Sequence, residues 1–358
     1  MVRPLFTWGL NSDAMSSQNS SVRWPPVPES PSSVTSRADE IEQRLEQHRA
    51  ELTAYCYRML ASPFEAEDAV QETLVRAWRS YEQFEGRAAL RSWLYRIATN
   101  VCLDMLNGRE RRARPMDFGP TWNPGGPIGR TLPEATWIEP LPDGLGLTAE
   151  DDPADVAVSR ETIRLAFVAA LQRLPPRQRA VLILREVLRW KATEVAELLE
   201  TSVASVNSAL QRARATLEGS EVKPTDPVPV MDEAQRELLA RYVEAFERYD
   251  MDALTALIHE DATQSMPPYE LWLTGRDDIL RWFVGPGAGC RGSRLIPTVA
   301  ANGSPAFGQY KPSATGSGYD PWALQVIEIA DGQVVELTFF LDTERLFPLF
   351  GLPARPDS

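Results

Sequence analysis

The chain of 358 residues lacks any apolar run close to the roughly twenty residues that a membrane span needs. The apolar stretch between Met1 and Leu10 is also too short for a signal peptide, and polar residues follow it instead of a small-residue cleavage site. We therefore expect a cytoplasmic protein that makes no membrane contact. Met15 is an alternative to Met1 as the first translated residue.

Cysteine and histidine are scarce, with three and two residues respectively. Cys56, Cys102 and Cys290 stand far apart, and neither His48 nor His259 forms a cluster with them at metal-ligand spacing. This composition predicts buried free thiols, no metal site and no cofactor.

The net charge of −13 is unusual for a nucleic-acid-binding protein, but the charge is unevenly distributed. Residues 86–115 and 160–217 each carry +5, whereas 116–159 carry −7 and 218–358 carry −11. Because charge interactions are screened beyond roughly 10 Å at 0.1 M salt, local charge matters more to phosphate binding than the total. The two basic blocks therefore indicate two nucleic-acid contacts, with chance variation of surface charge as the alternative.

Composition and periodicity divide the chain into segments. Apolar residues recur at three and four positions in two stretches, which indicates amphipathic helices, and proline-rich segments separate them. Beyond the second stretch, β-type runs flank Asp331-Gly332, a strong hairpin signal. The predicted segments are a disordered tail (1–38), a helical domain (39–114), an acidic Pro/Gly-rich linker (115–155), a second helical domain (156–218), a short linker (219–231), an α+β domain (232–350) and a C-terminal tail (351–358).

The second helical domain contains a helix-turn-helix pattern: Lys191–Leu199, a short turn, and then Val203–Leu217. We expect Val203, Val206 and Leu210 to face inward, while small and amide side chains on the opposite face suit the major groove. An ordinary pair of antiparallel helices is the alternative. The residues predicted to contact DNA are Ser202, Ala204, Ser205, Asn207, Ser208, Gln211 and Arg212.

Three stretches, 66–73, 92–100 and 174–179, resemble extracytoplasmic-function (ECF) sigma factors of the sigma-70 family, in order and spacing over roughly 45–217. The C-terminal part resembles a SnoaL-like domain of the ketosteroid-isomerase type. The resemblance implies two all-α domains, the second a helix-turn-helix, followed by an α+β cone. It further implies a non-enzymatic factor that directs promoter recognition, DNA melting and transcription initiation. Its partners would be core RNA polymerase and promoter DNA, and the free protein would be a monomer.

The resemblance also implies which residues open the DNA at the upstream melted element. Asn100 matches an amide that reads an unstacked base, whereas Leu90 stands where some relatives carry an aromatic residue. Trp93 and Tyr95 could instead be structural. The predicted contacts are Arg87, Arg91, Arg96, Thr99, Asn100, Leu103, Arg111 and Arg112.

The helix from Asp68 to Trp78 matches the one that binds the polymerase in the family. Its polar side comprises Asp68, Gln71, Glu72 and Arg76, and we expect Trp78 to face the core with Val70 and Leu74. An exposed acidic helix that is merely solvated is the alternative, with Glu72 and Arg76 paired along it.

In sigma factors the segment that corresponds to residues 115–155 enters the active-site cleft of the polymerase. A flexible acidic strand there could imitate RNA and be displaced by it, and an inert spacer is the alternative.

The C-terminal domain has three open interpretations: regulation in cis, binding of a small apolar ligand, or isomerase or cyclase activity. Enzymes of this fold pair a carboxylate base with an oxyanion donor, and no spacing identifies such a pair here. The candidate pocket residues are Asp261, Tyr269, Tyr310, Trp322 and Asp342. For the whole chain, a ligand-sensing helix-turn-helix regulator that dimerises on palindromic DNA is the alternative.

Overall fold

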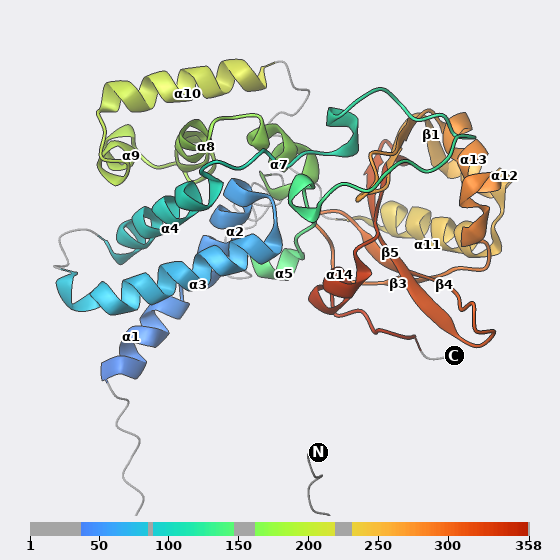
Figure 1. The fold of residues 1–358 in the computed structure, drawn as a ribbon, viewed down its shortest axis with the longest axis horizontal. Helices are drawn as coiled ribbons and strands as arrows, with labels where there is room; N and C mark the ends of the chain where they lie inside the picture. Colours follow the sequence, from blue (N-terminus) through green and yellow to red (C-terminus); the bar gives the residue numbers. More distant parts are fainter. Residues whose placement is uncertain (1–36, 85–88, 147–161, 219–230, 357–358) are drawn as a thin grey trace, which may run out of the picture. The chain divides into compact units, whose positions relative to one another are not determined.

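The computed structural model describes residues 37–84, 89–146, 162–218 and 231–356 (Figure 1). Contacts divide the chain into residues 1–40 and 41–358. Apart from residues 37–40, which begin the first helix, the features discussed below lie in the second unit. Arg87, the alternative start at Met15 and the most acidic part of the linker, residues 147–155, lie outside the described residues. No described helix is both long and apolar enough to cross a bilayer.

The first helical part is built around one buried helix. Its elements are α1 (Arg37–Glu46), α2 (Arg49–Leu60), α3 (Pro63–Ser80), η1 (Tyr81–Gln83) and α4 (Leu90–Leu106). Ser62 starts α3 by accepting a hydrogen bond from the Glu65 amide, and Pro63 fits the first turn. Nine consecutive residues of α2 are buried, so this helix is covered on every side.

The second helical part confirms the predicted helix-turn-helix. Its elements are α7 (Leu165–Gln172), α8 (Pro176–Leu182), η4 (Ile183–Val187), α9 (Ala192–Leu198) and α10 (Val203–Leu217). Glu200 in the turn has a φ of 51°, in the left-handed region where glycine is favoured. The turn therefore adopts the left-handed backbone conformation typical of glycine, although the residue here is glutamate.

The described part of the linker is packed against the rest of the unit, which corrects the expectation of a flexible strand. It contains η2 (Pro115–Asp117), η3 (Glu134–Thr136) and α5 (Asp143–Gly146). Trp137, Ile138 and Leu141 are buried. Burial of these apolar side chains stabilises the packed segment. The high charge and proline content of the sequence did not indicate this packing.

The C-terminal part is the predicted α+β fold. Its elements are α11 (Glu233–Arg248), α12 (Met251–Leu257), β1 (Ile258–Ser265), β2 (Trp272–Thr274), α13 (Arg276–Val284), η5 (Pro286–Cys290), β3 (Arg294–Pro297), β4 (Ala306–Pro312), β5 (Tyr319–Ala330), β6 (Gln333–Phe340) and α14 (Thr343–Leu349). The strand order is β2-β1-β6-β5-β4-β3, with only β1 and β6 parallel. Asp331 and Gly332 both have positive φ, as the predicted β5–β6 hairpin requires. Strand β2 and helices α13 and α14 were not predicted.

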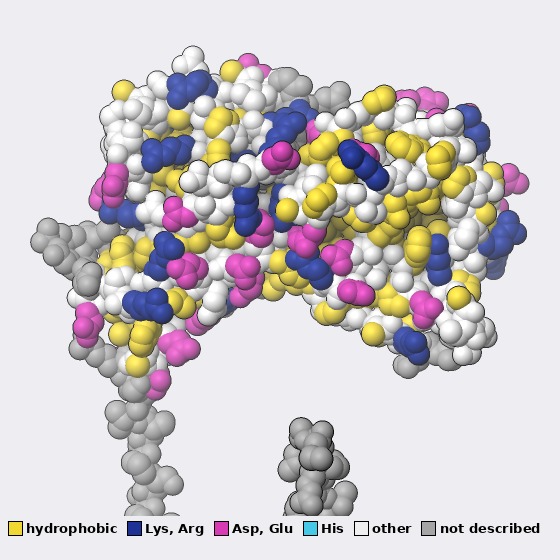
Figure 2. Space-filling model, in the orientation of Figure 1, with side chains coloured by type: hydrophobic (Ala, Val, Ile, Leu, Met, Phe, Trp, Pro, Cys, Tyr) yellow, Lys and Arg dark blue, Asp and Glu magenta, His cyan; other side chains and the backbone are white. Residues whose placement is uncertain are grey.

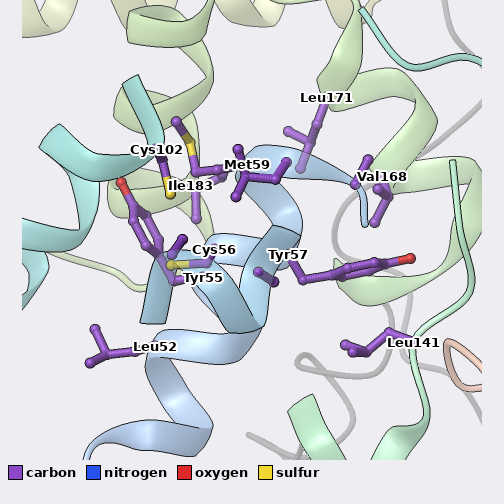
Figure 3. Packing of buried hydrophobic residues seen from close by; sticks show 14 of the residues in the cluster. Leu52, Tyr55, Cys56, Tyr57, Met59, Cys102, Leu141, Val168, Leu171 and Ile183 are labelled. Atoms are coloured by element: carbon purple, nitrogen blue, oxygen red, sulfur yellow. The ribbon is translucent and has the colours of Figure 1, made fainter. Parts of the chain in front are cut away.

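The sheet separates two hydrophobic cores. Phe339 packs with α11, α12 and α13 on one face, whereas Phe340 joins α14, the linker and both helical parts on the other, because successive strand residues point to opposite faces. In Figure 3, Tyr55 of α2 points toward Cys102 of α4 and Tyr57 toward Leu141 of the linker. Cys56 and Cys102 are buried free thiols, as expected, whereas the free thiol of Cys290 is only half-buried.

Candidate nucleic-acid interface and the contacts that enclose it

Helix α10 presents the surface that the sequence predicts for major-groove contact. Its inner face, which includes Val206 and Leu210, is buried against α8 and α9. Val203 was wrongly placed on that face, since it is 39% exposed at the first turn, beyond the reach of the core. The predicted DNA-contacting residues are all exposed: Ser202, Ala204, Ser205, Asn207, Ser208, Gln211 and Arg212.

Helix α4 presents Asn100 and Leu103 to a cavity of about 880 Å³. Asn100 is exposed and Leu103 is half-buried. Pro175, Pro176 and Arg177 of the second helical part also line it. The residue expected to read a flipped base therefore faces a hollow that the other helical part partly covers.

Other predicted DNA contacts on α4 are already engaged with the second helical part. The Arg96 guanidinium donates to the Glu197 carbonyl at 3.0 Å. Trp190 packs on Tyr95 with ring centroids 5.1 Å apart, and the Arg91 guanidinium lies over both rings. Helix α4 and the helix-turn-helix are thus in direct contact.

Two of the predicted DNA contacts lie in the interior. The Thr99 hydroxyl donates to the Tyr95 carbonyl and also bonds the Tyr55 hydroxyl. Arg112 is 5% exposed and donates to the Trp137 carbonyl at 2.6 Å. Neither side chain can reach DNA in this arrangement. Arg111 is exposed, and Arg87 lies outside the described residues.

Helix α3 presents the polar side predicted to contact the polymerase. Asp68, Gln71, Glu72 and Arg76 are exposed, and Glu72 pairs with Arg76 at 2.6 Å along the helix, as the alternative reading anticipated. Trp78 was wrongly assigned to the core, because its side chain is 55% exposed at the end of α3.

Trp93 and Tyr95 both contribute to packing in the first helical part. Trp93 is half-buried and stacks on Phe84, with the ring centroids 4.9 Å apart. Tyr95 is fully buried. The interpretation of both side chains as structural therefore has direct support.

The linker passes over the C-terminal part near β1 (Figure 1) and is hydrogen bonded to β2. The Trp122 amide donates to the Trp272 carbonyl at 2.8 Å, and the Trp272 indole donates to the Gly119 carbonyl at 3.0 Å. Farther along, the Leu132 amide donates to the Pro268 carbonyl at 2.9 Å. Figure 2 shows hydrophobic side chains gathered on the face of the C-terminal part that the linker crosses. The linker is therefore held by this domain.

Asn302, in the β3–β4 connection, joins several parts of the unit through one fully buried side chain. Its amide group donates to the Tyr57 hydroxyl of α2 at 2.8 Å and to the Ile163 carbonyl, just before α7, at 2.5 Å. Its carbonyl oxygen accepts from the Leu141 amide of the linker at 2.8 Å. Every hydrogen bond of this amide thus leads out of the C-terminal part.

Glu139 of the linker forms a second junction, between the first helical part and the C-terminal part. Its carboxylate lies 3.5 Å from Arg112 and 3.2 Å from Arg345 of α14. Burial raises the pKa of Glu139 to about 7, although a hydrogen bond from Ser62 and the two guanidinium groups act in the opposite direction. The charge state of this contact therefore changes close to neutral pH.

The predicted pocket residues are only partly brought together. Tyr269, Trp322 and Asp342 line one cavity of about 470 Å³, together with linker residues. Asp261 is exposed on β1 and is not among the lining residues. Tyr310 is not among the lining residues either; it is buried in the core that contains α14, and its hydroxyl donates to the Pro353 carbonyl at 2.7 Å. The sequence therefore grouped residues from three different environments.

Asn302 and Glu139 were not singled out in the sequence. The dipeptide Asn302-Gly303 signals a turn, and Asn302 has a positive φ of 54°, but a turn signal does not indicate what the side chain contacts. Glu139 is indistinguishable in sequence from the other acidic residues of the linker.

Comparison with known proteins defines the class. Residues 45–112 match the Sigma-70 region 2 family, 164–217 match Sigma-70 region 4, and 239–337 match the SnoaL-like domain. The ECF RNA polymerase sigma factor SigG of Mycobacterium tuberculosis is 46% identical over 324 residues, 88% of this chain and 85% of the relative. SigJ of the same organism is 29% identical over 303 residues, 81% of this chain and 88% of that protein.

The crystal structure of Mycobacterium tuberculosis SigJ shows the same fold, with a TM-score of 0.54 and 24% sequence identity over 89% of this chain and 100% of that one. Sigma-70 regions 2 and 4, joined to a SnoaL-like domain, define a transcription initiation factor of the sigma-70 class. At this identity and coverage, the chain belongs to the ECF RNA polymerase sigma factor family.

Proposed function

We propose that the C-terminal SnoaL-like domain regulates this sigma factor in cis, by holding its two DNA-contacting parts and its linker in a closed arrangement. The observation that carries the proposal is the buried Asn302 side chain, which bonds α2, the linker and the segment before α7 at once. Opening would break all three contacts together. The free factor would be a cytoplasmic monomer, and it would act when bound to core RNA polymerase.

The spacing of DNA contacts supports a closed, inactive state. A protein that grips separate sites on one face of a duplex needs them about one helical turn apart, roughly 34 Å. Here Arg96 of α4 is hydrogen bonded to Glu197 of α9. Two elements in direct contact cannot occupy separated promoter sites, so the parts must move apart to initiate transcription.

The position of the linker supports the same conclusion. In sigma factors this segment enters the active-site cleft of the polymerase, whereas here its backbone is hydrogen bonded to the C-terminal part at Trp272 and Pro268. Release from that surface would be a condition for productive binding. Mimicry of RNA by the acidic stretch would then operate only after release.

In the open state, we assign DNA melting to α4 and the segment that follows it, with Asn100 reading a base. The phosphate contacts would be Arg91 and Arg96 of α4, and Arg111 and Arg112 beyond its end. Arg112 must leave its buried ion pairs first. Helix α10 would read the upstream element through Gln211 and Arg212, and the exposed side of α3 would contact the polymerase. A ligand-sensing helix-turn-helix repressor is a poorer match, because the proposed DNA-contacting residues lie on two separate helical parts and not on the helix-turn-helix alone.

Run-off transcription with core RNA polymerase tests the proposal. The full-length chain and a truncation after Leu217 are compared on the same promoter, at equal concentrations of folded protein. We expect higher output per bound factor from the truncated protein, because it lacks Asn302 and the surface that holds the linker. Equal output from both proteins would count against regulation in cis.

A further inference from the structure

A cavity of about 470 Å³ lies where the linker crosses the C-terminal part. Thr131, Trp137 and Glu139 are on its linker side, and Tyr269 and Trp322 are on its domain side. Sites for small molecules have volumes of roughly 300 to 1,000 Å³. A ligand here would contact both surfaces at once.

The lining combines aromatic rings with carboxylates. No lysine or arginine is among the described residues that line it. Arg345 forms ion pairs with all three acidic side chains of the lining, and Arg112 also pairs with Glu139. The aromatic members are Trp137, Tyr269, Trp322 and Phe340, and the acidic members are Glu134, Glu139 and Asp342.

This combination of groups favours an organic cation. Aromatic faces attract cations through their quadrupoles, and such cages recognise quaternary ammonium groups. Trp322 already makes this kind of contact, since the Lys311 ammonium lies 3.1 Å from its ring centroid. An anion would face these carboxylates with no cation among the described lining residues, and a neutral ligand would gain no charge interaction with them.

We propose that this cavity binds an organic cation with an apolar body, and that the bound cation keeps the linker on the C-terminal domain. The regulatory half of this inference rests on the proposed function. Because linker residues form one wall, the complete site exists only in the closed arrangement. A ligand that binds one state shifts the population toward it, so the cation lowers transcription.

Glu139 supplies an independent signature of binding. Burial raises the pKa of this carboxyl to about 7, so near neutral pH a fraction of the protein carries it protonated. A cation in the cavity favours the ionised form, and binding therefore releases protons.

Calorimetry on the full-length chain at pH 7 tests the site, with benzyltrimethylammonium as the probe and phenylacetate as the anionic counterpart. We expect saturable binding of the cation only, with proton release that appears as a difference between phosphate and Tris buffers. Trp322→Leu should weaken binding about tenfold. Glu134→Gln, at an exposed position, should weaken it several-fold, and Glu344→Gln, an exposed acid on α14 outside the lining, should leave it unchanged.

Failure of the site and failure of closure give different results. If the cation does not bind, if phenylacetate binds equally, or if Trp322→Leu and Glu134→Gln both bind like the wild type, the inference is overturned, while transcription by the truncated protein still reports on closure. If the cation binds as expected but leaves run-off transcription unchanged, the link between the site and the linker is wrong.

Discussion

Replacing Asn302 by glycine should open the closed arrangement. Asn302 adopts a positive φ of 54°, which glycine accepts without strain, so the substitution removes the side chain and leaves the turn intact. The backbone amide of residue 302 can still donate to the Leu141 carbonyl. The perturbation is therefore confined to the hydrogen bonds that the side chain makes with Tyr57, Ile163 and Leu141.

The expected magnitude follows from what remains unpaired. Tyr57 keeps a partner, because its hydroxyl donates to the Glu139 carbonyl at 2.7 Å. The Leu141 amide and the Ile163 carbonyl, both in fully buried residues, lose theirs at about 1–3 kcal/mol each. The central sum for the two groups, about 4 kcal/mol, favours opening by roughly 800-fold.

Two measurements test this expectation. Hydrogen exchange of the peptide containing Leu141 should accelerate, because the amide of that residue donates to the deleted oxygen, and run-off transcription should increase. Asp331→Gly is the matched control, since it replaces another residue at positive φ by glycine, in an exposed hairpin turn of the same domain. Exchange and transcription like those of the wild type in Asn302→Gly would refute the reasoning, as would equal changes in the control.

Three further predictions concern other sites. Burial raises the pKa of Glu139 from its ordinary value near 4.5 to about 7, so the free energy of unfolding should fall by up to roughly 3 kcal/mol as the pH rises through this window. Urea unfolding at pH 5 and pH 8 should show a smaller fall in Glu139→Gln than in the wild type. An identical fall would contradict the burial argument. Trp78→Ala should weaken binding to core polymerase by about 2 kcal/mol with the urea midpoint nearly unchanged, whereas a large loss of stability would return Trp78 to the core. In the polymerase complex, Gln211→Ala should relax base preference at one upstream position, by about 1–3 kcal/mol. Arg212→Ala should weaken binding to all promoters and reduce the slope of log binding constant against log salt concentration by about one. The reverse pattern in a promoter-library competition would exchange the roles of the two residues.

The fold was accessible from the sequence where local rules agreed. The helices of both helical parts follow apolar periodicity, and the β5–β6 hairpin follows from Asp331-Gly332, which reverses the chain by residues at positive φ. Short elements between stronger signals were missed. Strand β2 has only three residues, too few for alternation to be recognised.

For the candidate site, the sequence predicted which residues share a helix face, but it did not predict what surrounds them in the folded protein. Gln211 and Arg212 are exposed because the 3.6-residue period places them opposite Leu210 and Ala213. The same period placed Trp78 in the core, but a residue near the end of a helix faces the core only if another element extends past it. Arg112 looked like its arginine neighbours until folding placed it beside Glu139.

By itself, the sequence determined which segments form helices and strands, which faces are apolar and which blocks are basic, because these properties depend on residues within a few turns of one another. The tertiary structure decided that the linker lies on the C-terminal domain, that Asn302 bonds residues far along the chain, and that carboxylates and aromatic rings share a cavity. These contacts join positions separated by up to 245 residues. Local periodicity carries no information about such partners.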